Sequence, residues 1–198
     1  MILLSPLNKG IIFIGLLLSL LFSAGCSEYT PKPKGYNRID DIESGFIEYN
    51  FPKFSFKYSD QVRIDTLQSK EKGEIWFNIV YPQYNATVYC TYLPISETTL
   101  PKLLEDSHRL AYSHALKADG IDQQIYVNED INVSGMLYSI TGNVATPAQF
   151  YLTDSIKHFF RGSFYYAEKV DMDSVAPITD VVMKDIKEMI NTFTWNNK

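Results

Sequence analysis

The feature that most constrains this chain is an apolar stretch that ends in a cysteine, residues 17–26. Residues 11–22 are almost wholly apolar, and Lys9 is the only charged residue before them. A short cationic region, an apolar region and then small residues form the layout of a secretory signal. The apolar run is shorter than the roughly 20 residues that a helix needs to cross a membrane. We therefore predict that residues 1–25 are a leader that is cleaved from the exported protein.

Cys26 directly follows three small residues, 23–25, and this arrangement resembles the bacterial lipobox. In a lipobox the cysteine thiol is thioether-linked to diacylglycerol, and after cleavage its amine is acylated. Two or three acyl chains, at about 0.8 kcal/mol per buried methylene, hold a protein stably on a bilayer. The position three residues before the cysteine is usually leucine, whereas here it is Ser23. We predict lipidation at Cys26; the alternative is a plain secretory signal with an incidental cysteine.

Composition excludes one class of partner and one kind of crosslink. The formal charge is -5 and there is no basic stripe, so nucleic acid is a poor candidate ligand. If Cys26 carries lipid, Cys90 has no partner for an intramolecular disulfide. Cys90 lies in an alternating apolar and polar run, which favours a packed strand residue over a nucleophile.

Residues 26–50 are predicted to be a lipidated tether. In residues 29–35, two prolines alternate with lysines, a pattern that favours extended polyproline II and forbids helix. At about 3.1 Å per residue such a segment is a semi-rigid spacer. It is predicted to be a solvated linker, and contact of its lysines with anionic headgroups is the alternative.

Residues 51–198 are predicted to form one domain that begins with strands. Period-two alternation at 54–58 and 62–67, around Ser59 and Asp60, predicts a hairpin. Strands at 75–81 and 86–93 would extend it to an antiparallel meander. Later strands are predicted at 124–127, 136–142, 148–153 and 158–166, with Gly162 marking a bulge or a close contact.

Two segments have helical periodicity. Apolar residues from Leu100 to Ala118 recur at spacings of three and four, with Gly120 as the stop signal. The second stripe runs from Ile178 to Phe193, with Pro177 in the first turn and the charged residues, Asp185 among them, on other faces. Strands, a helix, further strands and a closing helix predict an α+β fold, an antiparallel sheet with helices packed on it.

Motifs of catalysis are scarce. The sequence has no phosphate-binding glycine loop, and His108 and His114 are six residues apart, which does not suit metal ligation from one helix face. We predict no metal site, no cofactor and no catalytic residues, and therefore a protein that is not an enzyme.

One predicted turn gathers polar residues: Asp154, Ser155, His158 and Arg161. Ser155 as nucleophile, His158 as base and Asp154 as orienting group would make a hydrolase. The stronger interpretation is an ordinary Asx turn, because Asp-Ser is common at turns and adjacent strand residues point to opposite faces. Asp154, His158 and Arg161 are then predicted to belong to an interaction surface.

Three Asp-Ser or Asp-Thr pairs followed by an apolar residue place candidate acceptors at Thr66, Ser155 and Ser174. The pattern matches the one that periplasmic O-glycosylation uses in Bacteroidetes. Each pair is equally a normal turn or cap.

Several strings together resemble the gliding motility lipoprotein GldD family of Bacteroidetes, over residues 26–195. They are Tyr-Thr-Pro-Lys-Pro-Lys-Gly-Tyr at 29–36 directly after the lipobox, Lys-Ala-Asp at 117–119, Gln-Phe-Tyr-Leu-Thr-Asp-Ser at 149–155 and His-Phe-Phe-Arg-Gly at 158–162. The order of elements also resembles PsbP-like domains, which are α/β/α sandwiches around an antiparallel sheet.

The first resemblance implies a non-enzymatic envelope component needed for gliding and type IX protein secretion. Its partners would be the bilayer, through acylated Cys26, and other lipoproteins of the machinery, which it would assemble or stabilise. Surface-exported lipoproteins tend to carry an acidic cluster after the cysteine, and here only Glu28 is acidic, so a periplasm-facing anchor is expected. The alternatives are a periplasmic ligand- or cell-wall-binding module and the hydrolase that uses Ser155 and His158.

Overall fold

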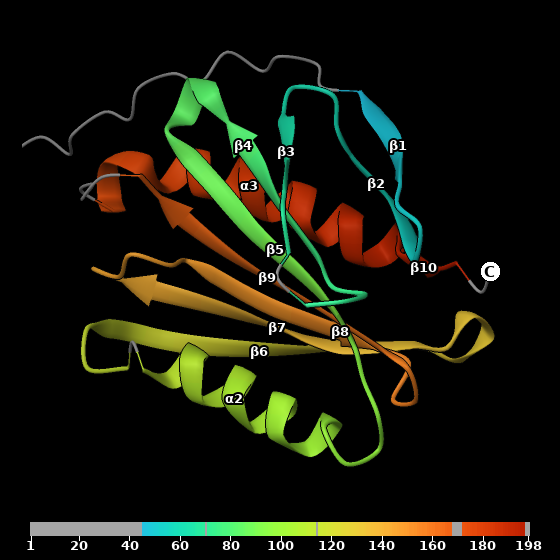
Figure 1. Cartoon of the computed structure of the whole chain (residues 1–198). Helices are drawn as coiled ribbons and strands as arrows, with labels where there is room; N and C mark the ends of the chain where they lie inside the picture. Colours follow the sequence, from blue (N-terminus) through green and yellow to red (C-terminus); the bar gives the residue numbers. More distant parts are fainter. Residues whose placement is uncertain (1–44, 70, 114, 168–171, 197–198) are drawn as a thin grey trace, which may run out of the picture. The chain divides into compact units, whose positions relative to one another are not determined.

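The computed structural model describes residues 45–69, 71–113, 115–167 and 172–196 (Figure 1). The chain divides into two units, residues 1–35 and 36–198, and all described residues belong to the second. The predicted leader, Cys26, most of the predicted tether and His114 lie outside the described residues. Within the described ranges, no helix is long and apolar enough to cross a membrane.

The larger of two sheets has seven strands in the order β3-β4-β5-β9-β8-β7-β6, and every neighbouring pair is antiparallel. The strands with helices between them confirm the predicted α+β class. Their bounds are β3 Arg63–Leu67, β4 Ile75–Tyr81, β5 Ala86–Pro94, β6 Ala118–Asn128, β7 Val133–Gly142, β8 Ala148–Thr153 and β9 His158–Tyr166.

Two connections in this sheet contain a single 3₁₀ turn, η1 Pro82–Tyr84 and η2 Glu129–Ile131. Each turn ends at an asparagine in the left-handed conformation, Asn85 with φ 48° and Asn132 with φ 51°. Asparagine tolerates this conformation better than most residues, so both turns reverse the chain tightly.

The smaller sheet joins the two ends of the domain. β2 (Phe54–Ser59) pairs with β1 (Phe46–Asn50) on one side and with β10 (Thr194–Trp195) on the other. The predicted hairpin of 54–58 with 62–67 is therefore wrong, because β3 leaves β2 and pairs with β4 in the other sheet. β1 also lies within residues 26–50, so the small sheet includes residues that were predicted to belong to the tether.

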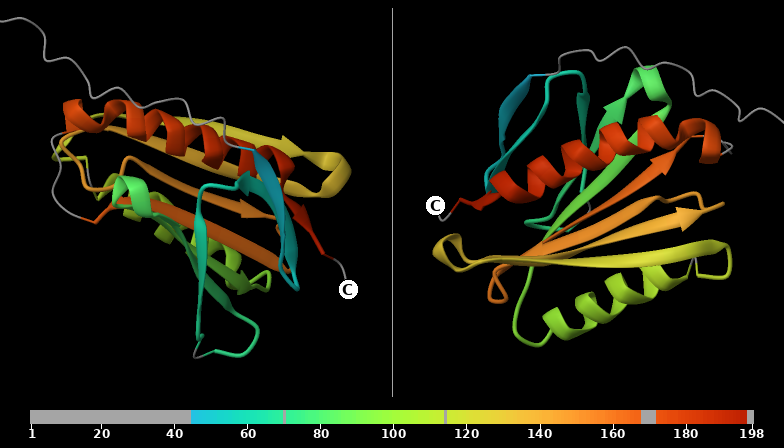
Figure 2. Two further views of the ribbon diagram at one scale, coloured as in Figure 1. Left: turned by 90° about the horizontal axis from the view of Figure 1, so that it is seen from above. Right: turned by 180° about the vertical axis from the view of Figure 1, so that it is seen from behind.

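Two helices cover opposite faces of the seven-stranded sheet (Figure 2). α2 (Leu100–Tyr112) packs against β8. α3 (Met172–Thr192) lies on the other face, beside the small sheet, and contacts β2. α2 ends earlier than predicted and β6 begins at Ala118, so the expected strand at 124–127 is longer. Pro177 lies inside α3 rather than in its first turn, because this helix begins at Met172.

The core between the large sheet and α3 is built from aromatic rings. Phe54 stacks on Phe193 with centroids 5.5 Å apart, and Phe160 contacts both rings at 5.1 Å. Gly162 makes the predicted close contact without a bulge: a Cβ there would lie 2.3 Å from the Phe150 ring on the neighbouring strand. The core therefore accepts the Phe150 ring only because position 162 has no side chain.

Candidate functional site

The turn between β8 and β9 is an Asx turn built on Asp154. Its Oδ1 accepts hydrogen bonds from the backbone N–H groups of Ile156, Lys157 and His158, at 2.9, 2.8 and 2.8 Å. Burial raises the pKa of the Asp154 carboxyl, but the three N–H donors outweigh it and the net pKa is lowered. Ser155 has φ +63° at the tip of this turn. Asp154 thus stabilises the turn through Oδ1.

His158 is part of a buried aromatic cluster. Its side chain is 8% exposed, its Nδ1 lies 2.7 Å from the Tyr92 hydroxyl, and its ring stacks on Trp195 at 5.1 Å. Burial lowers the pKa of the imidazole, while the nearby Asp154 charge partly opposes this shift. The neutral ring therefore serves packing, and its nitrogen is satisfied by a tyrosine.

The residues of the hydrolase alternative are close in sequence, but the hydrogen bond that joins Asp154 to His158 is donated by the backbone N–H of His158. Ser155 donates its backbone N–H to Thr153 Oγ1, and no hydrogen bond between Ser155 Oγ and the His158 ring occurs among the described residues. A nucleophile and its base need to be within about 2.6–3.2 Å of each other. The geometry required for acyl transfer is not assembled here.

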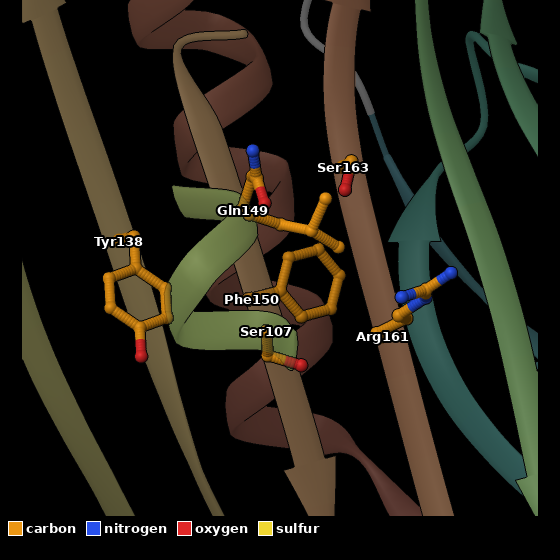
Figure 3. Close-up of a pocket in the computed structure, with 7 residues that line it drawn as sticks. Ser107, Tyr138, Gln149, Phe150, Arg161 and Ser163 are labelled. Atoms are coloured by element: carbon orange, nitrogen blue, oxygen red, sulfur yellow. The ribbon is translucent and has the colours of Figure 1, made fainter. Parts of the chain in front are cut away.

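Arg161, the third residue of the predicted interaction surface, differs from Asp154 and His158. It is half-buried on β9, and its guanidinium has no ion pair or hydrogen bond with any residue in the described ranges. Figure 3 shows its side chain extending away from Phe150 and Gln149. Among the three predicted residues, Arg161 alone presents an unused charged group.

Arg161 borders a shallow hollow between α2 and the sheet (Figure 3). The volume that the hollow encloses is about 10 Å³, far below the roughly 300–1,000 Å³ typical of small-molecule pockets. Its wall is mixed in polarity and is formed by Ser107, Leu110, Tyr138, Gln149, Phe150, Arg161 and Ser163.

The sequence prediction missed one buried acid. Asp185 was expected on a solvated face of α3, yet it is 2% exposed. The Tyr81 hydroxyl lies 2.7 Å from both Asp185 Oδ2 and the Tyr58 hydroxyl. Because Tyr81 has one hydroxyl proton, donating it to Asp185 leaves Tyr81 to accept from Tyr58. Burial raises the pKa of Asp185 from 3.8 to about 6, against the opposing effects of Tyr81 and Lys184.

The position of Asp185 was available in the sequence. It lies three residues after Val182 and four before Met189, which are both fully buried, so helical spacing places it on the apolar stripe. Tyr81 on β4 and Tyr58 on β2 face the core from the two sheets; Tyr81 contacts the acid, and Tyr58 contacts Tyr81. Helical spacing thus indicates that Asp185 is buried, whereas the charge of its side chain favours a solvated face.

No group of three or more metal-ligating side chains occurs within the part of the chain that the structure describes. Cys90 is 2% exposed, and burial raises the pKa of its thiol well above the usual value. A neutral, enclosed thiol is a poor nucleophile. Thr66, Ser155 and Ser174 are all exposed, so the glycosylation prediction stays open at each position.

The domain is an α+β fold in which helices cover both faces of a seven-stranded antiparallel sheet. Residues 26–195 match the family described as "Gliding motility lipoprotein GldD", and the chain belongs to that family. No curated protein matches the chain.

Among solved structures, the solution structure of cyanobacterial PsbP (CyanoP) from Synechocystis sp. PCC 6803 is similar, with 13% identity and a TM-score of 0.44. The similarity covers 83% of this chain and 99% of that one.

Proposed function

We propose that the chain is a lipid-anchored, non-enzymatic envelope component that acts in gliding motility and type IX protein secretion by docking and stabilising other lipoproteins of this machinery. The observation that carries the proposal is where the family match starts: residue 26, the cysteine that the lipobox pattern predicts to bear lipid. The acyl chains on Cys26 hold the domain at the periplasmic side of a membrane.

The contacts of the polar turn support a non-enzymatic role. Asp154 stabilises the turn, His158 is bound by Tyr92, and Ser155 lies at an exposed tip. Groups that act together in acyl transfer must be within hydrogen-bond reach. Binding is therefore the role that the described surface supports best.

The free edge of β6 is the docking element in this proposal. β6 has 11 residues and ends the order of the large sheet, so one row of its backbone groups has no strand partner among the described residues. Ile125 and Val127 point out from it and are 70% and 66% exposed. An extended segment of a partner adds to such an edge by main-chain hydrogen bonds and apolar contacts. A partner on the same membrane meets this edge at a high effective concentration.

Affinity purification from native membranes tests the docking role. A C-terminally tagged copy is expected to recover other envelope lipoproteins, and Cys26→Ala is expected to reduce that recovery. The double variant Ile125→Asp, Val127→Asp should lose the partners while remaining in the membrane fraction. Ile156→Asp is the matched control, because Ile156 is 61% exposed and belongs to the β8–β9 turn, not to β6. Recovery of the bait alone from the wild type would refute stable docking.

Complementation of a gliding-deficient null strain tests the non-enzymatic part. Ser155→Ala is expected to restore gliding and secretion fully, since Ser155 contributes only its backbone N–H to the turn. Loss of gliding with a normally folded and normally abundant Ser155→Ala protein would contradict this part of the proposal. The alternative function, a cell-wall-binding module, is favoured by the exposed aromatic side chains of Trp76 and Tyr89 on the large sheet.

A further inference from the structure

Three aromatic side chains form a diagonal row on the face of the large sheet that carries α2. Phe77, Val88 and Phe164 point into the core, so the neighbouring residues Trp76, Tyr89 and Tyr165 point to the opposite face. Trp76 lies opposite Thr91 on β5, and Tyr165 lies opposite Thr87. Tyr89 is between these two levels, so each step along the row is diagonal. We call Trp76, Tyr89 and Tyr165 the aromatic row.

The aromatic row is open to solvent. Trp76 is 39% and Tyr89 49% exposed, and Tyr165 is half-buried with its ring edge against Tyr89, at 5.9 Å between centroids. α2 packs on β8, and the hollow at its edge reaches only as far as Arg161 and Ser163 on β9. With about 7–8 Å for each diagonal step between strands, the row spans about 15 Å. This is the length of a short chain of sugar rings rather than of one small molecule.

Hydrogen-bonding side chains fill the positions between the rings. Asn78 and Ser163 lie directly opposite Tyr89 on either side, and Thr91 lies between Trp76 and Arg161. The core of a protein–protein interface is enriched in aromatic residues and arginine but depleted in serine. A sugar ring, by contrast, has an apolar C–H face for stacking and a rim of hydroxyl groups. Alternating rings and polar groups on a β surface therefore suit a glycan better than the dry core of a protein partner.

The charged side chains on this face indicate that the ligand is negatively charged. Arg63 and Asp65 neutralise each other through paired contacts at 2.8 and 2.9 Å. Arg161 lies at the same level as Trp76 across β5, and it has no ion pair or hydrogen bond with a described residue. A half-buried guanidinium without a partner is suited to bidentate binding of a carboxylate.

We propose that the aromatic row and Arg161 form a binding site for a glycan that carries carboxylate groups. Sugar rings stack on Trp76 and Tyr89, hydroxyl groups bond with Asn78, Thr91 and Ser163, and a carboxylate binds Arg161. The site lies on β4, β5 and β9, whereas the docking edge is β6, three strands beyond β9. Glycan binding and protein docking therefore can be disrupted separately.

Calorimetric titration of the full-length lipoprotein in detergent tests the site. The probes are a galacturonic acid hexamer, a soluble peptidoglycan fragment with lactyl carboxylates, and a neutral glucose hexamer as the charge control. Binding of the first or of the second identifies the source of the carboxylate. Trp76→Ala is expected to weaken binding about tenfold or more, as for other central aromatic contacts. Arg161→Gln is expected to remove the preference for acidic over neutral probes.

Two controls keep the test specific. Tyr112→Ala removes an exposed aromatic ring from α2, and Arg109→Gln removes an exposed arginine from the same helix, so neither should change glycan affinity. The proposal is overturned if neither acidic probe binds, or if the variants of the row bind as well as the wild type. It is also overturned if the wild type binds no glycan and Trp76→Ala and Arg161→Gln recover fewer protein partners in the membrane purification. The face would then be a protein interface.

Discussion

Replacing Asp185 by asparagine measures what a buried charge costs this fold. The carboxyl is 2% exposed, and its pKa in the folded protein is about 6 compared with an ordinary 3.8. Because the folded-state pKa is the higher one, the group contributes stability below pH 3.8 that is lost as the pH rises through about 6. The difference of about 2 pKa units corresponds to ~3 kcal/mol of stability.

Asparagine keeps an acceptor oxygen for the Tyr81 hydroxyl and has no charge. We therefore expect wild type and Asp185→Asn to differ in unfolding free energy by a pH-dependent amount. As the pH rises from about 4 to about 8, the unfolding free energy of the variant should increase by ~3 kcal/mol relative to that of the wild type. The assay is urea unfolding of the full chain across this range, followed by the fluorescence of Trp195, which is 9% exposed.

Asp180→Asn is the matched control, because Asp180 is exposed on the same helix. The unfolding free energy of Asp180→Asn should vary with pH in parallel with that of the wild type. If Asp185→Asn also runs parallel to the wild type over the whole pH range, Asp185 is not a desolvated acid and the reasoning is refuted. A loss of stability at every pH would show instead that the amide cannot replace the carboxyl as the partner of Tyr81.

Three further predictions concern packing and the polar turn. Gly162→Ala places a methyl group 2.3 Å from the Phe150 ring and should lower the unfolding free energy by about 1–3 kcal/mol, measured by thermal or urea unfolding. Phe150→Leu in the same chain should restore part of this loss. An unchanged unfolding midpoint for Gly162→Ala would contradict the close contact. Tyr92→Phe leaves His158 Nδ1 without its partner and should cost about 1–3 kcal/mol, and an effect below experimental error would show that another group satisfies the ring. Asp154→Ala removes three hydrogen bonds and should lower the unfolding free energy by ~2 kcal/mol at neutral pH. Because the pKa of Asp154 is lowered in the folded protein, its stabilising contribution is lost as the pH falls, and the difference from wild type should shrink in acid. A difference that does not change with pH would refute this prediction.

Local pattern predicted most of the strands but not their partners. β4, β8 and β9 begin and end where β-prone apolar or aromatic runs bounded by turn residues predicted them. Alternation in β2 predicted the strand but gave no information about pairing, and β3, the next strand along the chain, was the wrong partner. Ser55 bonds instead with Thr194, at 2.9 Å and 139 positions away. Such pairings are selected by packing of the whole core, in which Phe54 and Phe193 meet.

The candidate sites were predicted less completely than the fold, for a similar reason. The Asx turn at Asp154 is a local motif, and its hydrogen bonds confirm that interpretation. The aromatic row needs the register of β4, β5 and β9, because Trp76 and Tyr165 are 89 positions apart and meet only across the sheet. To predict that Asp185 is buried, helical spacing must be given more weight than the charge of the side chain.

β2 also bears on how a chain delivered from its N-terminus acquires this fold. When synthesis or export proceeds vectorially, β1 and β2 emerge early, but Thr194 of β10 arrives 139 positions after Ser55 of β2. Until Thr194 and Trp195 reach it, one edge of β2 remains unpaired and the core lacks the ring of Phe193. The small sheet therefore forms only after β10 has emerged, and a product truncated before residue 193 would be left with an open edge for proteases and chaperones to detect.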